Sequence, residues 1–120
     1  NIAKKYNKAF ENDSRFILPN IDNLNVSHAY HLYPLQINFN KLKITKKLFF
    51  KKMQSHQINL QVHYLPLHLQ PFFKKKLRYN KGDFIFAEEF YEREVSLPIF
   101  PNLSANDQKM IIKTIKKLLR

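Results

Sequence analysis

The chain has 120 residues and a formal net charge of +12, with no cysteine, no tryptophan and a single glycine. A Walker A loop or a GxGxxG dinucleotide fingerprint needs two or three glycines within one turn, so lone Gly82 excludes both. The absence of cysteine excludes disulfides, Cys-ligated zinc, iron–sulfur clusters and thiol nucleophiles, and the 44% apolar composition is typical of one folded domain.

The first part of the chain predicts a helix followed by a strand. Apolar residues recur at helical spacing over residues 1 to about 11, and residues 12–27 are rich in Asn, Asp and Ser, as in a connecting loop. Residues 29–38 are dense in aromatic and branched side chains and predict a strand. Pro34 cannot donate a ladder hydrogen bond, which favours an edge position or a bulge.

The middle of the chain predicts a second helix and a second strand. Residues 42 to about 57 have apolar side chains at helical spacing with lysines outward. Residues 58–64 alternate apolar and polar side chains, as in a half-buried strand. Residues 65–83 contain two prolines and the only glycine, so we expect a loop there with one short helical turn over 72–77.

The last third predicts two helices around a short strand. Residues 84–95 have a helical pattern, and we expect four carboxylates on its exposed face: Glu88, Glu89, Glu92 and Glu94. Residues 95–99 predict a strand interrupted by Pro98, and Ser104 is a good N-cap for an amphipathic last helix. This element order predicts an α+β fold, a small antiparallel or mixed three-stranded sheet covered by helices.

The strong positive charge has two interpretations. The basic residues are mostly lysine, whereas base readout and bidentate phosphate contacts favour arginine. We therefore favour solvated helix faces over a nucleic-acid surface. A stand-alone module that binds nucleic acid or another anionic polymer remains the alternative function.

The sequence contains no recognisable metal or nucleophile motif. The five histidines stand in no HExxH or Cys/His spacing, and no serine lies in GxSxG. Polar side chains instead gather in residues 61–73, QVHYLPLHLQPFF, where a predicted strand passes into a loop. Such places often bind ligands because a rigid element positions groups that the loop leaves accessible, although the same pattern fits ordinary amphipathic packing.

Three segments together carry a family resemblance: AYHLYPLQINF, then QVHYLPLHLQPFF, then GDFIFAEEFYEREVSLPIFPNLSANDQKMI. In this order and spacing, the chain resembles the C-terminal part of the DegT/DnrJ/StrS family of pyridoxal-phosphate-dependent sugar aminotransferases, in particular the branch that acts in pseudaminic acid synthesis. The resemblance covers essentially the whole chain. It implies the fold of the C-terminal small domain of fold type I aminotransferases.

The resemblance also implies which residues contact substrate. Carried over residue by residue, it places four residues at a nucleotide-sugar site: Gln61, Val62, His63 and Tyr64. It makes His68 and Gln70 supporting residues. Family members often have glycine before this segment, where this chain has Gln57.

The family transfers an amino group from an amino acid such as glutamate to C4 of a UDP-linked 4-keto-6-deoxy sugar, in the cytoplasm. Its Schiff-base lysine and phosphate-binding segment precede the region that this chain matches. The resemblance therefore implies that residues 1–120 are a C-terminal domain without the cofactor domain, through truncation, a split gene or a fragment. We expect no pyridoxal phosphate on this chain alone and no activity from it alone, because the cofactor-binding lysine domain is missing. The expected partners are the UDP-linked 4-keto sugar and a large-domain chain or a second copy of this chain, with no membrane. A further alternative is a non-catalytic UDP-sugar-binding subunit.

Overall fold

A computed structural model describes residues 1–19 and 28–120, so the predicted loop at 12–27 lies partly outside the described residues. The sheet has three antiparallel strands in the order β1 (Phe16–Ile17), β2 (Tyr33–Ile37) and β3 (Glu94–Leu97). The α-helices of the described residues are α1 (Ile2–Phe10), α2 (Lys46–Ser55), α3 (Pro71–Leu77), α4 (Ile85–Arg93) and α5 (Ala105–Leu118). Short 3₁₀ helices occupy Phe39–Lys41 and Leu67–Leu69. The predicted α+β fold is confirmed.

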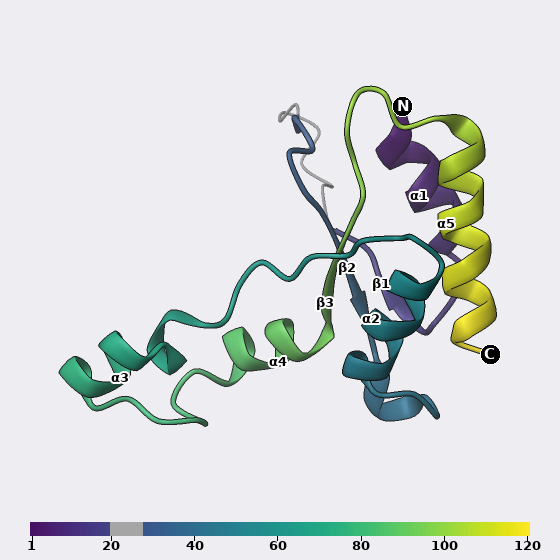
Figure 1. Cartoon of the computed structure of the whole chain (residues 1–120). Coiled ribbons are helices and arrows are strands. Elements are labelled where there is room, and N and C mark those ends of the chain that lie inside the picture. The colour runs from purple at the N-terminus through teal and green to yellow at the C-terminus, as the bar shows by residue number, and fades with distance from the viewer. Residues whose placement is uncertain (20–27) are drawn as a thin grey trace.

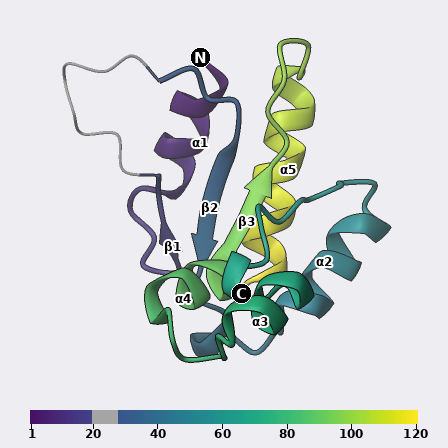
Figure 2. The ribbon, with the colours of Figure 1, turned by 90° about the vertical axis from the view of Figure 1, so that its left-hand side faces the viewer.

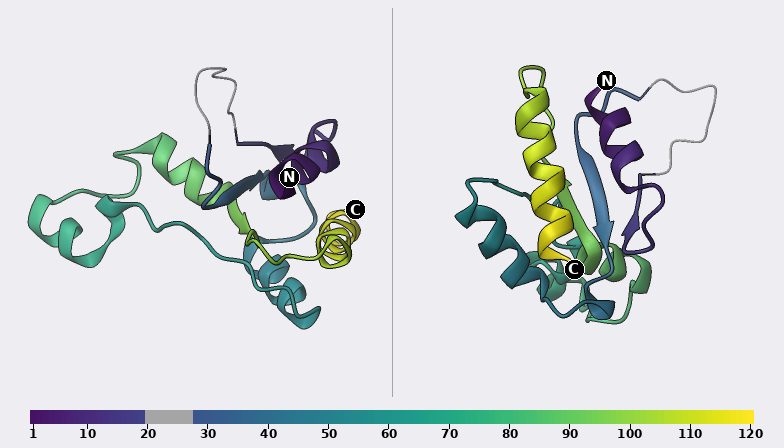
Figure 3. Two further views of the ribbon diagram at one scale, coloured as in Figure 1. Left: turned by 90° about the horizontal axis from the view of Figure 1, so that it is seen from above. Right: turned by 90° about the vertical axis from the view of Figure 1, so that its right-hand side faces the viewer.

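Helices α1 and α5 cover one face of the sheet, and α2 lies beside α5 (Figures 1 and 3). Residues 65–93, which include α3 and α4, project from the other side and are called the arm below (Figure 1). Figure 2 shows the arm in front of the sheet. The two ends of the arm therefore join the rest of the chain next to β3.

The core lies between the sheet and the helices α1, α2 and α5. Its fully buried side chains include Tyr6, Phe10, Tyr33, Leu35, Ile37, Phe49, Met53, Val95 and Ile115. Successive strand residues point to opposite faces, so β3 turns Val95 and Leu97 to this core and Glu94 and Ser96 to the side of the arm. Among the described residues, no helix combines the length and apolarity needed to cross a membrane.

Hydrogen bonds of α1 to residues near the C-terminus tie the ends of the chain together. Tyr6 donates its hydroxyl to the Pro98 carbonyl at 2.9 Å, and Gln108 on α5 donates to the Ile2 carbonyl at 2.8 Å. The predicted N-cap of the last helix is confirmed, since Ser104 Oγ accepts the Asp107 N–H at 3.0 Å.

The end of α2 forms a Schellman motif around Gln57. The Ile58 N–H donates to the Met53 carbonyl at 3.0 Å, and the Gln57 N–H donates to the Gln54 carbonyl at 2.9 Å. Gln57 has φ +60°, the left-handed conformation in which glycine is favoured. Glycine adopts this conformation without strain, whereas Gln57 adopts it here with a Cβ.

Pro34 lies in the central strand, so the expectation of an edge or bulge position is wrong. Pro34 is opposite Ser96, and the backbone N–H and carbonyl of Ser96 bond to Gln61 on the far side of β3. In an antiparallel pair of this kind, both residues turn their backbone groups away from each other, so the carbonyl and nitrogen of Pro34 point away from β3. They point past the end of β1, which pairs only with Gln36 and Ile37, so the proline removes no ladder bond.

The predicted strand at 58–64 is wrong, and β1 supplies the third strand instead. Only Gln61 pairs with the sheet, through an isolated bridge to Ser96. The next backbone donor that could extend the pairing, the His63 N–H, bonds to the carboxylate of Glu94 at 3.0 Å. A side chain thus takes the place of a strand partner, and the chain turns out toward the arm.

Candidate functional site

The four predicted site residues lie in one short segment between α2 and the arm. Both backbone groups of Gln61 bond to β3: its N–H donates to the Ser96 carbonyl at 3.3 Å, and its carbonyl accepts the Ser96 N–H at 2.9 Å. Val62 and His63 are half-buried, while Gln61 and Tyr64 are exposed, Tyr64 to 72%. The sheet therefore holds this segment at its edge and leaves two of its side chains open to solvent.

His63 makes two hydrogen bonds, and a third joins their partners, on the side of β3 that faces the arm. Its Nδ1 lies 2.8 Å from Ser96 Oγ, and the Ser96 hydroxyl donates to Glu94 Oε1 at 2.6 Å. The other carboxylate oxygen, Oε2, accepts the His63 backbone N–H at 3.0 Å. Tyr64 sets its ring edge-on against that of His63, with 4.7 Å between centroids, and the peptide bond joining them is cis.

Two of the four glutamates expected on an exposed helix face are buried. Glu94 has no exposed surface, because it is the first residue of β3 rather than the last turn of a helix; Glu88 is 9% exposed. Spacing of two residues on a strand puts Glu94 and Ser96 on one face. The observed helix ends at Arg93, two residues before the predicted end, and an end there places this pair on the strand.

The side chain of Lys46 is the half-buried cation near Glu94. Its Nζ donates to the Tyr91 carbonyl and lies 4.9 Å from the centre of the Tyr91 ring. Burial lowers the pKa of the Lys46 ammonium, and attraction to Glu94 and Glu92 opposes that shift. Lys46 therefore supplies positive charge near the buried carboxylate of Glu94.

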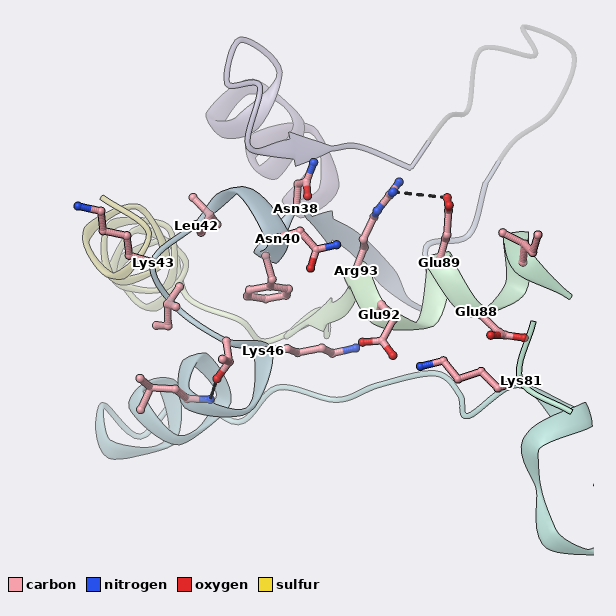
Figure 4. A pocket seen from close by; sticks show the side chains of 15 residues that line it. Asn38, Asn40, Leu42, Lys43, Lys46, Lys81, Glu88, Glu89, Glu92 and Arg93 are labelled. Carbon is pink, nitrogen blue, oxygen red and sulfur yellow. Dashed lines mark hydrogen bonds and ion pairs between the residues drawn. The ribbon is translucent and has the colours of Figure 1, made fainter. Parts of the chain in front are cut away.

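A cavity of about 750 Å³ opens between the start of α2 and helix α4 (Figure 4). Its charged lining residues are Lys43, Lys46, Lys81, Glu88, Glu89, Glu92 and Arg93. Figure 4 shows Lys46 and Glu92 pointing toward one another and the ion pair of Glu89 with Arg93, 3.4 Å apart. None of the four predicted site residues lines this cavity.

The two predicted supporting residues lie within the arm, just before α3. His68 is buried, and its Nε2 donates to Glu88 Oε1 at 2.9 Å; the same oxygen accepts the Gly82 N–H at 2.7 Å. Both hydrogen bonds lower the pKa of Glu88, the one from the Gly82 N–H more than the one from His68. Gln70 makes one long hydrogen bond, to the Leu65 carbonyl at 3.4 Å. His68 thus stabilises the arm and lies apart from the His63 network.

The described residues include no group of three or more His, Asp or Glu side chains that could hold a metal ion. The lysines on the outer faces of α2 and α5 are exposed, as the solvated-face interpretation predicts: Lys47, Lys51, Lys52, Lys109, Lys113 and Lys117.

The layered sheet, with an arm that leaves beside its edge strand, is the arrangement found in chains of sugar aminotransferases. The chain superposes on Helicobacter pylori PseC, an aminotransferase of pseudaminic acid biosynthesis, with TM-score 0.83 and 26% identity, over 98% of this chain and 31% of that one. It superposes equally on the sugar aminotransferase Spr1654 of Streptococcus pneumoniae in its PMP form, with TM-score 0.84 and 26% identity, over 98% and 29%.

The chain belongs to the DegT/DnrJ/EryC1/StrS aminotransferase family, whose model matches residues 1–116. It is 46% identical to the uncharacterised protein MJ1066 of Methanocaldococcus jannaschii, over 98% of this chain and 30% of the relative. It is 31% identical to the UDP-4-amino-4,6-dideoxy-N-acetyl-β-L-altrosamine transaminase of Campylobacter jejuni, again over 98% and 30%. The chain thus spans about 30% of the length of these relatives.

Lys46 does not fit the role of the lysine that holds pyridoxal phosphate in this family. Its amino group is bound to the Tyr91 carbonyl, and two aromatic rings, those of Phe50 and Tyr91, flank it. We therefore assign no cofactor chemistry to the residues around Lys46.

Proposed function

We propose that this chain is the C-terminal, substrate-contacting domain of a pyridoxal-phosphate-dependent aminotransferase. In this proposal, the enzyme transfers an amino group from an amino acid such as glutamate to C4 of a UDP-linked 4-keto-6-deoxy sugar. The cofactor is held by a large domain or partner chain that residues 1–120 do not supply. Family membership and the names of the relatives support the reaction class.

The observation that carries the proposal is the segment Gln61, Val62, His63 and Tyr64. One end is fixed to β3 by two backbone hydrogen bonds, and the other end carries an exposed tyrosine beside a half-buried histidine. Binding sites combine this kind of fixed polar group with accessible aromatic surface. The segment can therefore form one wall of a nucleotide-sugar site.

The test is titration of the isotope-labelled chain with UDP-N-acetylglucosamine at millimolar concentration, followed by backbone amide NMR. We expect the signals of residues 61–64 to move, and His63→Ala to weaken the response. The matched control is His56→Ala, because His56 is exposed at the end of α2 and bonds only to its own helix turn. Movement confined to other residues, or a response that His63→Ala leaves intact, would contradict the assignment.

A further inference from the structure

The buried carboxylate of Glu94 determines the direction of the hydrogen bonds that reach His63. Glu94 has no exposed surface, and the structure gives it two donors, one for each oxygen. The positive charge of Lys46 stands nearby and is attracted to it. Both contacts are donated to the carboxylate, one by a backbone N–H and one by a hydroxyl, so Glu94 acts only as an acceptor in this network.

Ser96 transmits this direction to the imidazole ring. A serine hydroxyl has one proton, and Ser96 gives it to Glu94 Oε1 at 2.6 Å. Its oxygen must then accept at the contact of 2.8 Å with His63 Nδ1, so Nδ1 carries the ring proton. In a neutral imidazole the other nitrogen is then an acceptor.

That second nitrogen, His63 Nε2, has no hydrogen-bond partner within residues 1–19 and 28–120. It belongs to a half-buried side chain next to the exposed ring of Tyr64. A fixed acceptor there suits a hydroxyl or amide N–H group. The oxygens of a diphosphate carry no proton at neutral pH and would find no donor at that atom.

We propose that Glu94 is a positioning residue that acts through Ser96 to hold His63 in its Nδ1–H tautomer. His63 Nε2 then accepts a hydrogen bond from a sugar hydroxyl or N-acetyl N–H of the nucleotide sugar. This proposal rests on the proposed function, in which His63 contacts that substrate. Glu94 and Ser96 set which part of the substrate the histidine recognises.

The variant Glu94→Gln keeps the shape of the side chain but reverses the direction of the hydrogen bonds through Ser96. The His63 backbone N–H can only donate, so the glutamine oxygen must face it and the NH₂ group must face Ser96. Ser96 then accepts from the amide and turns its own proton toward His63 Nδ1. The ring is thereby forced into the Nε2–H tautomer, as happens when an amide replaces the carboxylate that orients a catalytic histidine.

The test reads the imidazole nitrogens by ¹⁵N NMR near neutral pH, where a protonated nitrogen and a bare one have distinct chemical shifts. We expect Nδ1–H for His63 in the parent chain, Nε2–H in Glu94→Gln, and retention of Nδ1–H in Ser96→Thr, which keeps the hydroxyl. His56 is an internal reference, since its Nδ1 lies 2.8 Å from the Lys52 carbonyl, which can only accept. An Nε2–H ring in the unmodified chain overturns the proposal even if no variant folds.

Titration with UDP-N-acetylglucosamine separates this proposal from the proposed function. We expect the Nε2 signal of the parent chain to move, and Glu94→Gln to bind about tenfold more weakly, since a donor then faces a donor. If His63 of the parent chain is in the Nδ1–H form but its Nε2 signal does not move when UDP-N-acetylglucosamine is added, the proposed function is refuted. The tautomer assignment then still stands. A response of equal size in parent and Glu94→Gln refutes the positioning role.

Discussion

Gln57 holds a left-handed backbone conformation at the end of α2, and its side chain is exposed. Replacement by glycine therefore removes strain without removing contacts. The left-handed conformation costs a non-glycine residue about 1–2 kcal/mol. Glycine loses about 0.5–1 kcal/mol more conformational entropy on folding, so the expected net stabilisation by Gln57→Gly is about 0.5–1 kcal/mol.

The assay is urea unfolding followed by far-UV circular dichroism, in which the midpoint should rise with no change in slope. Gln54→Gly is the matched control, because Gln54 is an exposed residue within α2, where glycine costs about 1 kcal/mol. Gln57→Ala should bring no gain, since alanine has the same difficulty at positive φ. A Gln57→Gly variant that unfolds at the same or lower urea concentration than the parent would refute this reasoning.

Three further substitutions test other parts of the structure. Tyr6→Phe removes the hydroxyl that donates to the carbonyl of half-buried Pro98 and should cost about 0.5–1.5 kcal/mol in urea unfolding. Burial raises the pKa of Tyr6 above its usual 10.0, so the parent should lose stability as the pH rises above 10.0, and unfolding of Tyr6→Phe should show a shallower alkaline decline. Ser104→Ala removes the cap of α5 and should cost about 1 kcal/mol by the same measurement, whereas an unchanged midpoint would mean that the cap contributes nothing. Because the pKa of Glu88 is lowered, the stabilisation that its hydrogen bonds give the fold is present above its usual pKa of 4.5 and is lost as the pH falls below that value. Glu88→Gln should therefore speed amide exchange in the arm at neutral pH but not at acidic pH, while exposed Glu89→Gln should have little effect at either; equal effects of the two would argue against the buried contact.

Local patterns predicted the helices well. The stripe that buries Tyr6 and Phe10, the cap at Ser104 and the short helical turn over 72–77 all depend on residues a few positions apart. Helical spacing and capping are properties of one segment, so they can be read without knowing what the segment packs against.

The strands were less predictable, because pairing depends on distant partners. Residues 58–64 alternate as a strand should, yet Glu94 captures the backbone donor of His63 and ends the pairing after one residue. The dipeptide at Phe16–Ile17 has too little pattern to predict a strand, and it becomes one because β2 lies beside it. Pro34 is acceptable in the middle of the sheet only because of the register of Ser96.

The sequence by itself determined the α+β class, the family resemblance and the segment Gln61–Tyr64 as the candidate site. Only the tertiary structure brought Glu94 and Ser96 against His63, across a separation of about thirty residues that no local period reports. The physical reason is that a buried carboxylate needs donors, and the fold provides them from a segment that crosses the edge of β3. The tertiary structure thus selected one atom, His63 Nε2, as the acceptor that the candidate site presents.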